Sequence, residues 1–188
     1  MKFALVTGCT GFIASHLVER LLLDNWNVLG LDNFHPYYDK ELKLKNLANF
    51  KDHKNFKFVE GSILDLDLLK TFSNVDTVFH LAAIAGVRNS FNNPQEYFDI
   101  NVKGTENILK TFQNIDELVF ASSSSVYGEL KQNEFPVKET HSLNPISPYG
   151  ESKKQSELLC EHYSKSSKIR TSILRFYTVY GPRQRPDE

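Results

Sequence analysis

Tyr149 and Lys153 are the first pair of side chains in this sequence whose types and spacing could do chemistry. A separation of four residues places both on the same face of a helix. A free phenol ionises near about pH 10, and a neighbouring ammonium group favours its ionised, basic form. Such a pair could take a proton from a hydroxyl group. Surface packing of two unrelated side chains is the alternative, because this spacing is common by chance.

Serine occupies the consecutive positions 122–125, directly after an apolar stretch that predicts a strand at 117–121. A hydroxyl group at the end of a strand could bind a sugar hydroxyl or a carbonyl and pass a proton to a nearby tyrosinate. The spacing does not say which serine acts, and a plain polar turn is the alternative.

Gly8 and Gly11 follow the short apolar run 3–6 and precede apolar residues at helical spacing. This pattern predicts a buried strand, a tight turn and a helix that begins near Gly11. Backbone N–H groups at such a helix N-terminus bind the pyrophosphate of a dinucleotide. The third glycine position of the fingerprint is Ala14, a variant that the general pattern tolerates.

Asp32 stands at the end of the next predicted strand, 28–31, roughly 20 residues after the glycines. A carboxylate at this place accepts a hydrogen bond from the ribose 2′-hydroxyl and repels a 2′-phosphate. Together with the glycine turn, Asp32 predicts an NAD site.

Alternating strands and helices must position these residues. Further strands are predicted at 56–60, 77–81 and 169–176, and further helices at about 40–50, 65–72, 94–112 and 148–165. The alternation predicts a doubly wound α/β fold, with a parallel sheet in the Rossmann-like order 3-2-1-4-5-6 and helices on both faces. Ligands then bind beyond the carboxyl ends of the strands.

The composition excludes several classes of protein. The 188 residues fit one domain, and a formal net charge of −1 offers no field for nucleic acid or a membrane surface. No apolar run approaches the roughly 20 residues of a membrane span, and the N-terminal run breaks too early for a signal peptide. The two cysteines and six dispersed histidines match no metal site. We expect a cytoplasmic protein with reduced cysteines and no metal.

Several stretches together resemble the extended short-chain dehydrogenase/reductases, and within them the NAD-dependent epimerase/dehydratase family. The stretches are 7–13, 31–33, 80–83, 101–105, 125–128, 147–153 and 175–182. The resemblance implies that Ser123 is the catalytic hydroxyl, Tyr149 the base, and Lys153 its electrostatic partner. The cofactor-binding residues that it implies are Gly8, Gly11, Phe12, Ile13, Asp32, Asn33, Ser62, Ile63, Leu81, Ala82, Ala83, Asn101, Tyr149, Lys153 and Tyr177.

Two residues depart from the pattern of this family. Ala14 replaces the third glycine, and Ser62 replaces the acid usual near adenine, so we expect weaker adenine contacts without loss of binding. Dehydratases of the group carry Asp-Glu after the catalytic hydroxyl, where this chain has Ser124 and Ser125. The resemblance therefore favours C4 epimerisation of a nucleotide sugar through a 4-keto intermediate.

A finer resemblance, in 32–39, 85–88 and 181–187, is to the UDP-glucuronate 4-epimerases. The forked guanidinium of arginine suits the carboxylate of such a sugar. The substrate-binding residues implied are Arg88, Ser123, Ser124, Tyr149, Thr178 and Arg185. Solvated loop charge is the alternative for both arginines. A 4-epimerase of neutral UDP-glucose, UDP-galactose or N-acetylated sugars, and a non-catalytic NAD-binding domain, stay open as other functions.

Members of the family continue past the position of Glu188 with a further strand and a substrate lobe. We therefore expect residues 1–188 to be the NAD-binding domain with the catalytic residues, lacking most of that lobe. The resemblance also implies a homodimer formed through the helices at about 94–112 and 148–165.

Overall fold

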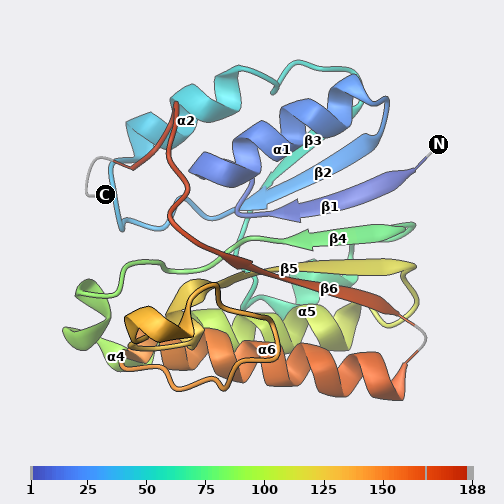
Figure 1. Cartoon of the computed structure of the whole chain (residues 1–188). Coiled ribbons are helices and arrows are strands. Elements are labelled where there is room, and N and C mark those ends of the chain that lie inside the picture. Colours follow the sequence, from blue (N-terminus) through green and yellow to red (C-terminus); the bar gives the residue numbers. More distant parts are fainter. Residues whose placement is uncertain (1, 168, 186–188) are drawn as a thin grey trace.

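The computed structural model of the protein describes residues 2–167 and 169–185 (Figure 1). Within these residues, parallel strands form one sheet in the order β3-β2-β1-β4-β5-β6. The strands are β1 (Phe3–Thr7), β2 (Asn27–Asp32), β3 (Phe56–Glu60), β4 (Thr77–His80), β5 (Glu117–Ser123) and β6 (Arg170–Phe176). The predicted fold class and strand order are confirmed.

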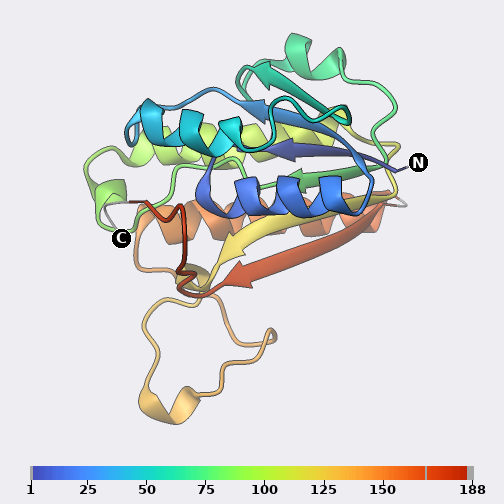
Figure 2. The same cartoon turned by 90° about the horizontal axis from the view of Figure 1, so that it is seen from above.

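Helices cover both faces of the sheet (Figures 1 and 2). One face carries α1 (Phe12–Leu23) and α2 (Lys40–Ala48), and the other carries α3 (Leu66–Lys70), α5 (Gly104–Thr111) and α6 (Pro148–Ser166). The shorter helical pieces are α4 (Pro94–Tyr97), a π-helical turn at Phe98–Lys103, and 3-10 turns at Asn89–Phe91, Ser124–Val126 and Gln132–Glu134. No helix among the described residues is both long and apolar enough to cross a membrane.

The core lies in two layers, one on each face of the sheet. Side chains of a strand point alternately to opposite faces. On β1, Ala4 and Val6 therefore pack with α1 and α2, while Leu5 packs with α5 and α6. Because both faces of β1 are buried, its sequence is a continuous apolar run rather than an alternating one.

The helix predicted at 94–112 is divided by the π-helical turn Phe98–Lys103. Within this turn the backbone carbonyl of Asn101 accepts hydrogen bonds from Thr105 Oγ1 at 2.6 Å and from Ser156 Oγ at 3.0 Å. These hydroxyl groups satisfy the carbonyl and stabilise the wider turn. The helical spacing of apolar residues does not predict the π-helical turn, because the spacing continues across it.

Strand β5 runs two residues further than predicted and ends at Ser123. Ser122 and Ser123 therefore point to opposite faces of the sheet. The other differences from the predicted boundaries are of the size by which element ends commonly vary.

The segment between β5 and α6 projects away from the sheet (Figure 2). Arg175, on β6, attaches it to the body of the protein. Its Nη1 donates to the carbonyl of Glu139 at 2.8 Å and to Tyr127 Oη at 3.0 Å, and within the segment the rings of Tyr127 and His141 lie edge to face. The segment leads into α6, where Ser147 Oγ accepts a hydrogen bond from Gly150 N at 3.1 Å and Pro148 occupies the first turn. Both features favour a helix start here, so the position of Tyr149 is fixed locally.

Replacing the cap of α6 should therefore cost stability. We expect Ser147→Ala to lower the free energy of unfolding by about 1 kcal/mol, and the Tm by about 2–4 °C. Thermal denaturation measures this, with Ser142→Ala in the exposed part of the same segment as the matched control. Equal losses in the two variants would contradict the role of the cap.

Candidate active site

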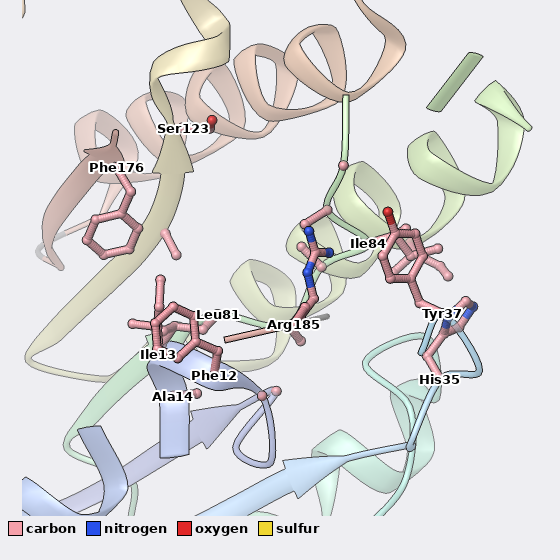
Figure 3. A pocket seen from close by; sticks show the side chains of 18 of the residues that line it. Phe12, Ile13, Ala14, His35, Tyr37, Leu81, Ile84, Ser123, Phe176 and Arg185 are labelled. Atoms are coloured by element: carbon pink, nitrogen blue, oxygen red, sulfur yellow. The ribbon is translucent and has the colours of Figure 1, made fainter. Parts of the chain in front are cut away.

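The carboxyl ends of the strands open into a cavity of about 650 Å³ (Figure 3). Its walls come from the turn after β1, the end of β2, the loops after β3 to β6, and the start of α6. The predicted site residues that line it are Gly8, Gly11, Phe12, Ile13, Asp32, Asn33, Ser62, Ile63, Leu81, Ala82, Ala83, Ser123, Ser124, Tyr149, Lys153, Tyr177, Thr178 and Arg185. The volume suits a small-molecule ligand.

The glycine turn forms the floor of the cavity. Gly8 has φ +70°, and a Cβ there would lie 2.9 Å from the backbone N and Cα of Ala82. Gly8 therefore allows β1 and the loop after β4 to approach closely. The following helix α1 begins at Phe12 without a side-chain cap, so its first N–H groups are available to an anion.

Asp32 is oriented by the turn beside it. Its Oδ2 accepts hydrogen bonds from Thr10 N at 3.1 Å and Thr10 Oγ1 at 2.7 Å, and its Oδ1 accepts from Phe34 N at 2.9 Å. An ionised carboxylate can accept about four hydrogen bonds, so Asp32 retains capacity for a ligand hydroxyl.

Lys43 lies in the same part of the cavity, and the sequence did not indicate it. It is only 6% exposed, its Nζ donates to the carbonyl of His35 at 2.7 Å, and it lies over the ring of Tyr38 at 4.5 Å. Burial lowers the pKa of Lys43, although Asp32 raises it. The charged, polar sequence of α2 predicts a solvated surface helix. Nothing in this pattern indicates that one of its lysines points inward.

Ser123, Tyr149 and Lys153 line the same cavity. Ser123 Oγ accepts a hydrogen bond from Ser125 N at 3.1 Å and contacts Ser125 Oγ at 3.1 Å. Lys153 is 4% exposed, and its Nζ donates to the carbonyl of Ala121 at 2.8 Å. The structure thus brings the predicted hydroxyl, phenol and ammonium groups into one cavity.

Burial lowers the pKa of Lys153 to about 8, and the smaller influences of Cys160 and Glu157 act in the opposite direction. A lysine with this pKa is charged at neutral pH. It can therefore favour ionisation of the neighbouring Tyr149 phenol.

His80 is a buried, neutral residue behind the site. Burial, and then the charge of Lys153, lower its pKa to about 3. Thr105 Oγ1 donates to the carbonyl of Asn101, so it must accept the contact at 3.1 Å from His80 Nε2–H. Thr7 Oγ1 accepts from Leu81 N and Ala82 N, so its proton goes to His80 Nδ1 at 2.8 Å. This directed chain of hydrogen bonds fixes the loop after β4.

Asn101 supports the same loop rather than lining the cavity. Its Oδ1 accepts from Ile84 N at 2.8 Å, and its Nδ2 donates to Ile84 O and to Ser152 Oγ, both at 3.0 Å. Its side-chain hydrogen bonds are thus made within the protein.

The two predicted arginines have different positions. The guanidinium group of Arg185 lies over the ring of Tyr37, 4.9 Å from its centroid, at the cavity (Figure 3). Arg88 is exposed beside the 3-10 turn Asn89–Phe91 and is not among the described residues that line the cavity. Pro186 and Asp187, which belong to the resembling stretch 181–187, lie outside the described residues.

Ser62 has a local role in the loop after β3. Its Oγ accepts from Leu64 N at 3.1 Å, and Asn107 Nδ2 donates to the carbonyl of Ile63 at 3.1 Å. Elsewhere, the described residues contain no group of three or more metal-ligating side chains, and Cys9 and Cys160 are both buried free thiols.

Residues 4–188 match the NAD dependent epimerase/dehydratase family, and the chain belongs to this family. NAD is the cofactor of the family. Among relatives, the chain is 49% identical over 187 residues to the uncharacterized UDP-glucose epimerase YtcB of Bacillus subtilis, with 97% of this chain and 58% of that protein covered. It is 40% identical over 193 residues to the UDP-glucuronate 4-epimerase of Thermodesulfobacterium geofontis, with 100% of this chain and 59% of that protein covered.

A crystal structure of the UDP-glucuronic acid 4-epimerase from Bacillus cereus, in complex with UDP-glucuronic acid and NAD, superposes with a TM-score of 0.93 at 40% identity. The match covers 99% of this chain and 60% of that one. The chain thus spans about three fifths of the length of these proteins.

Removal of the buried charge of Lys153 should stabilise the protein at neutral pH. Below about pH 8 the lysine is charged in the folded and unfolded states, so folding includes the full cost of burying the charge. Between about pH 8 and its ordinary pKa of 10.5, only the folded state loses the proton, and the cost decreases as pH rises.

We therefore expect Lys153→Met to have a higher Tm than the unaltered chain at about pH 7, and a smaller advantage at about pH 10. Thermal denaturation at both pH values measures this, with Lys154→Met, at the next and less buried position, as the control. A loss of stability that is equal at the two pH values would contradict the expectation.

Proposed function

We propose that this chain is the NAD-binding and catalytic part of a nucleotide-sugar 4-epimerase that acts on UDP-glucuronate through a 4-keto intermediate. The observation that carries the proposal is the meeting of Ser123, Tyr149 and Lys153 in one cavity with the glycine turn and Asp32. A binding module without catalysis has no need of the three catalytic side chains.

The residues present fit NAD. The close approach at Gly8, the uncapped start of α1 and the oriented carboxylate of Asp32 suit a pyrophosphate and a ribose hydroxyl. When bound, NAD supplies an acceptor for a hydride and returns it. Ile63 and Leu81 also line the cavity, and Ser62 is held in its own turn.

The side chains of this protein would move and hold the proton. Tyr149 accepts the proton of the sugar 4-hydroxyl, and the buried charge of Lys153 makes the phenol more acidic. Ser123 donates a hydrogen bond to the same sugar oxygen. Since Ser124 and Ser125 stand where dehydratases have acidic residues, elimination of water lacks its acid and the reaction stops at epimerisation.

A uronate substrate is supported by the position of Arg185 and Thr178 at the cavity. The forked guanidinium group binds a carboxylate with two hydrogen bonds, which a neutral sugar does not provide. A second candidate is epimerisation of a neutral UDP-sugar, favoured by the 49% identity to a protein named a UDP-glucose epimerase.

The assembly and location of the protein belong to the same proposal. We propose a homodimer formed through the helical layer of α5 and α6, by analogy with the family. A reducing, cytoplasmic location is supported by two buried thiols that are not paired in a disulfide.

Incubation with NAD⁺ and UDP-glucuronate, followed by chromatography of the nucleotide sugars, tests the proposed reaction. We expect UDP-galacturonate, and a loss of about 100-fold or more in rate for Tyr149→Phe, because this variant lacks the base. UDP-pentose as the product would contradict the argument from Ser124 and Ser125. NAD bound without any product would favour a non-catalytic NAD-binding domain. The same assay on a chain extended past Glu188 would then distinguish such a domain from part of an epimerase.

Arg185 provides a test of the substrate class. We expect Arg185→Ala to lower kcat/KM for UDP-glucuronate by about 10- to 100-fold more than for UDP-glucose, since only the uronate offers a carboxylate. Arg88→Ala, outside the cavity, is the matched control and should leave the ratio unchanged. Equal losses with both sugars would mean that Arg185 does not recognise the carboxylate.

A further inference from the structure

A buried carboxylate adjoins the catalytic lysine and has no part in the mechanism described so far. Glu157 is 1% exposed and lies on α6, one helical turn after Lys153. Ser122 Oγ donates a hydrogen bond to its Oε1. Arg175 donates from Nε to Oε1 at 3.0 Å and from Nη2 to Oε2 at 2.8 Å.

We infer that Glu157 is a positioning residue that keeps Lys153 charged and in place beside Tyr149. The inference rests on the proposed function, since Lys153 needs its charge only if Tyr149 acts as a base.

Helix α6 is attached to β5 at two successive residues, because Lys153 Nζ donates to the carbonyl of Ala121 and Ser122 Oγ donates to Glu157. Figure 1 shows α6 running along the part of the sheet formed by β5 and β6. Ser123 follows directly in the strand. The two attachments therefore set the position of Lys153 along α6 relative to the serine hydroxyl.

Several groups surround the ammonium group of Lys153. From β4 comes the neutral His80, from β5 the ring of Phe120 at 5.0 Å and the Ala121 carbonyl, and from α6 the Cys160 thiol. Burial raises the pKa of Cys160 to about 12, so the thiol is neutral. The carboxylate of Glu157, paired with the guanidinium group of Arg175 from β6, is the remaining charged group near Lys153.

This negative charge opposes the effect of burial on Lys153. Desolvation lowers the pKa of the lysine, and Glu157 raises it. A nearby opposite charge favours the charged form of a titratable group, commonly by about one pKa unit or more. Without Glu157, a larger fraction of Lys153 would be neutral near physiological pH, and the phenol of Tyr149 would lose its cationic neighbour.

Arg175 holds the carboxylate in this orientation. It lies at the end of β6, binds both oxygens of Glu157, and also donates to Tyr127 Oη at 3.0 Å. A buried ion pair adds little net stability compared with apolar packing. The buried pair of Glu157 and Arg175 is therefore better explained by a function of the Glu157 charge than by stability.

Glu157→Gln removes the charge while retaining the shape and an oxygen that Ser122 can bind. The titration of Lys153 is followed by NMR of isotope-labelled lysine, with Lys153→Met used to assign its signal. We expect its midpoint to fall by about one unit. The tyrosinate absorbance of Tyr149, measured as the difference from Tyr149→Phe, should titrate at a higher pH than in the unaltered chain.

Ser122→Ala is the matched control, because it removes a hydrogen bond of Glu157 and leaves the charge. It should shift the midpoint of Lys153 by much less than Glu157→Gln does. An unchanged midpoint in Glu157→Gln, or an equal shift in Ser122→Ala, would overturn the inference. Neither titration requires turnover, so the result is independent of whether the chain epimerises a sugar.

A second variant covers the case in which Glu157→Gln does not fold because Arg175 has lost its partner. Glu157→Gln/Arg175→Gln removes both charges of the pair. We expect a downward shift of the Lys153 midpoint here also, because Glu157 acts on the lysine directly. The shift should be smaller than in the single variant, since the removed positive charge of Arg175 has the opposite effect. An unchanged midpoint in this double variant would equally overturn the inference.

Discussion

The close approach of two backbone segments at Gly8 is the constraint on which the rest of the site depends. The turn after β1 donates from Gly8 N to the carbonyl of Leu31 at 2.8 Å on one side. On its other side the loop after β4 comes so near that a Cβ on Gly8 would overlap the backbone of Ala82. The connections from β1 and β4 leave in opposite directions along the sheet, which opens the cavity between them. Every proposed ligand contact is arranged around this opening.

Two kinds of interaction then hold the walls. Neutral hydrogen bonds through His80 and Asn101 fix the loop after β4. A buried cation and a buried ion pair fix α6 against β5 and β6. The neutral network tolerates changes in pH, whereas the charged one responds to them. The neutral residues that shape the cavity are thus distinct from the charged residues around Lys153.

Much of this arrangement could be predicted from local patterns. The glycine turn, Asp32 and the alternation of elements depend on residues close in sequence, and these predictions of fold and strand order are confirmed. Lys43 could not be predicted, because its helix is polar and its inward direction is set by packing against the loop that contains Tyr38. The partnership of Glu157 with Arg175 joins two elements whose relative position follows only from the assembled sheet. The exposed position of Arg88 is likewise a property of the loop conformation.

The fixed tautomer of His80 has a consequence for how this chain can vary in evolution. The site needs an acceptor facing Thr7 and a donor facing Thr105, on opposite sides of one rigid ring. Asparagine or glutamine could reproduce one of these groups at a time, and no apolar residue reproduces either. Any replacement would also leave the hydroxyl of Thr7 or Thr105 with an altered partner inside the core. Few substitutions at position 80 are therefore neutral, although His80 is buried and is not among the described residues that line the cavity.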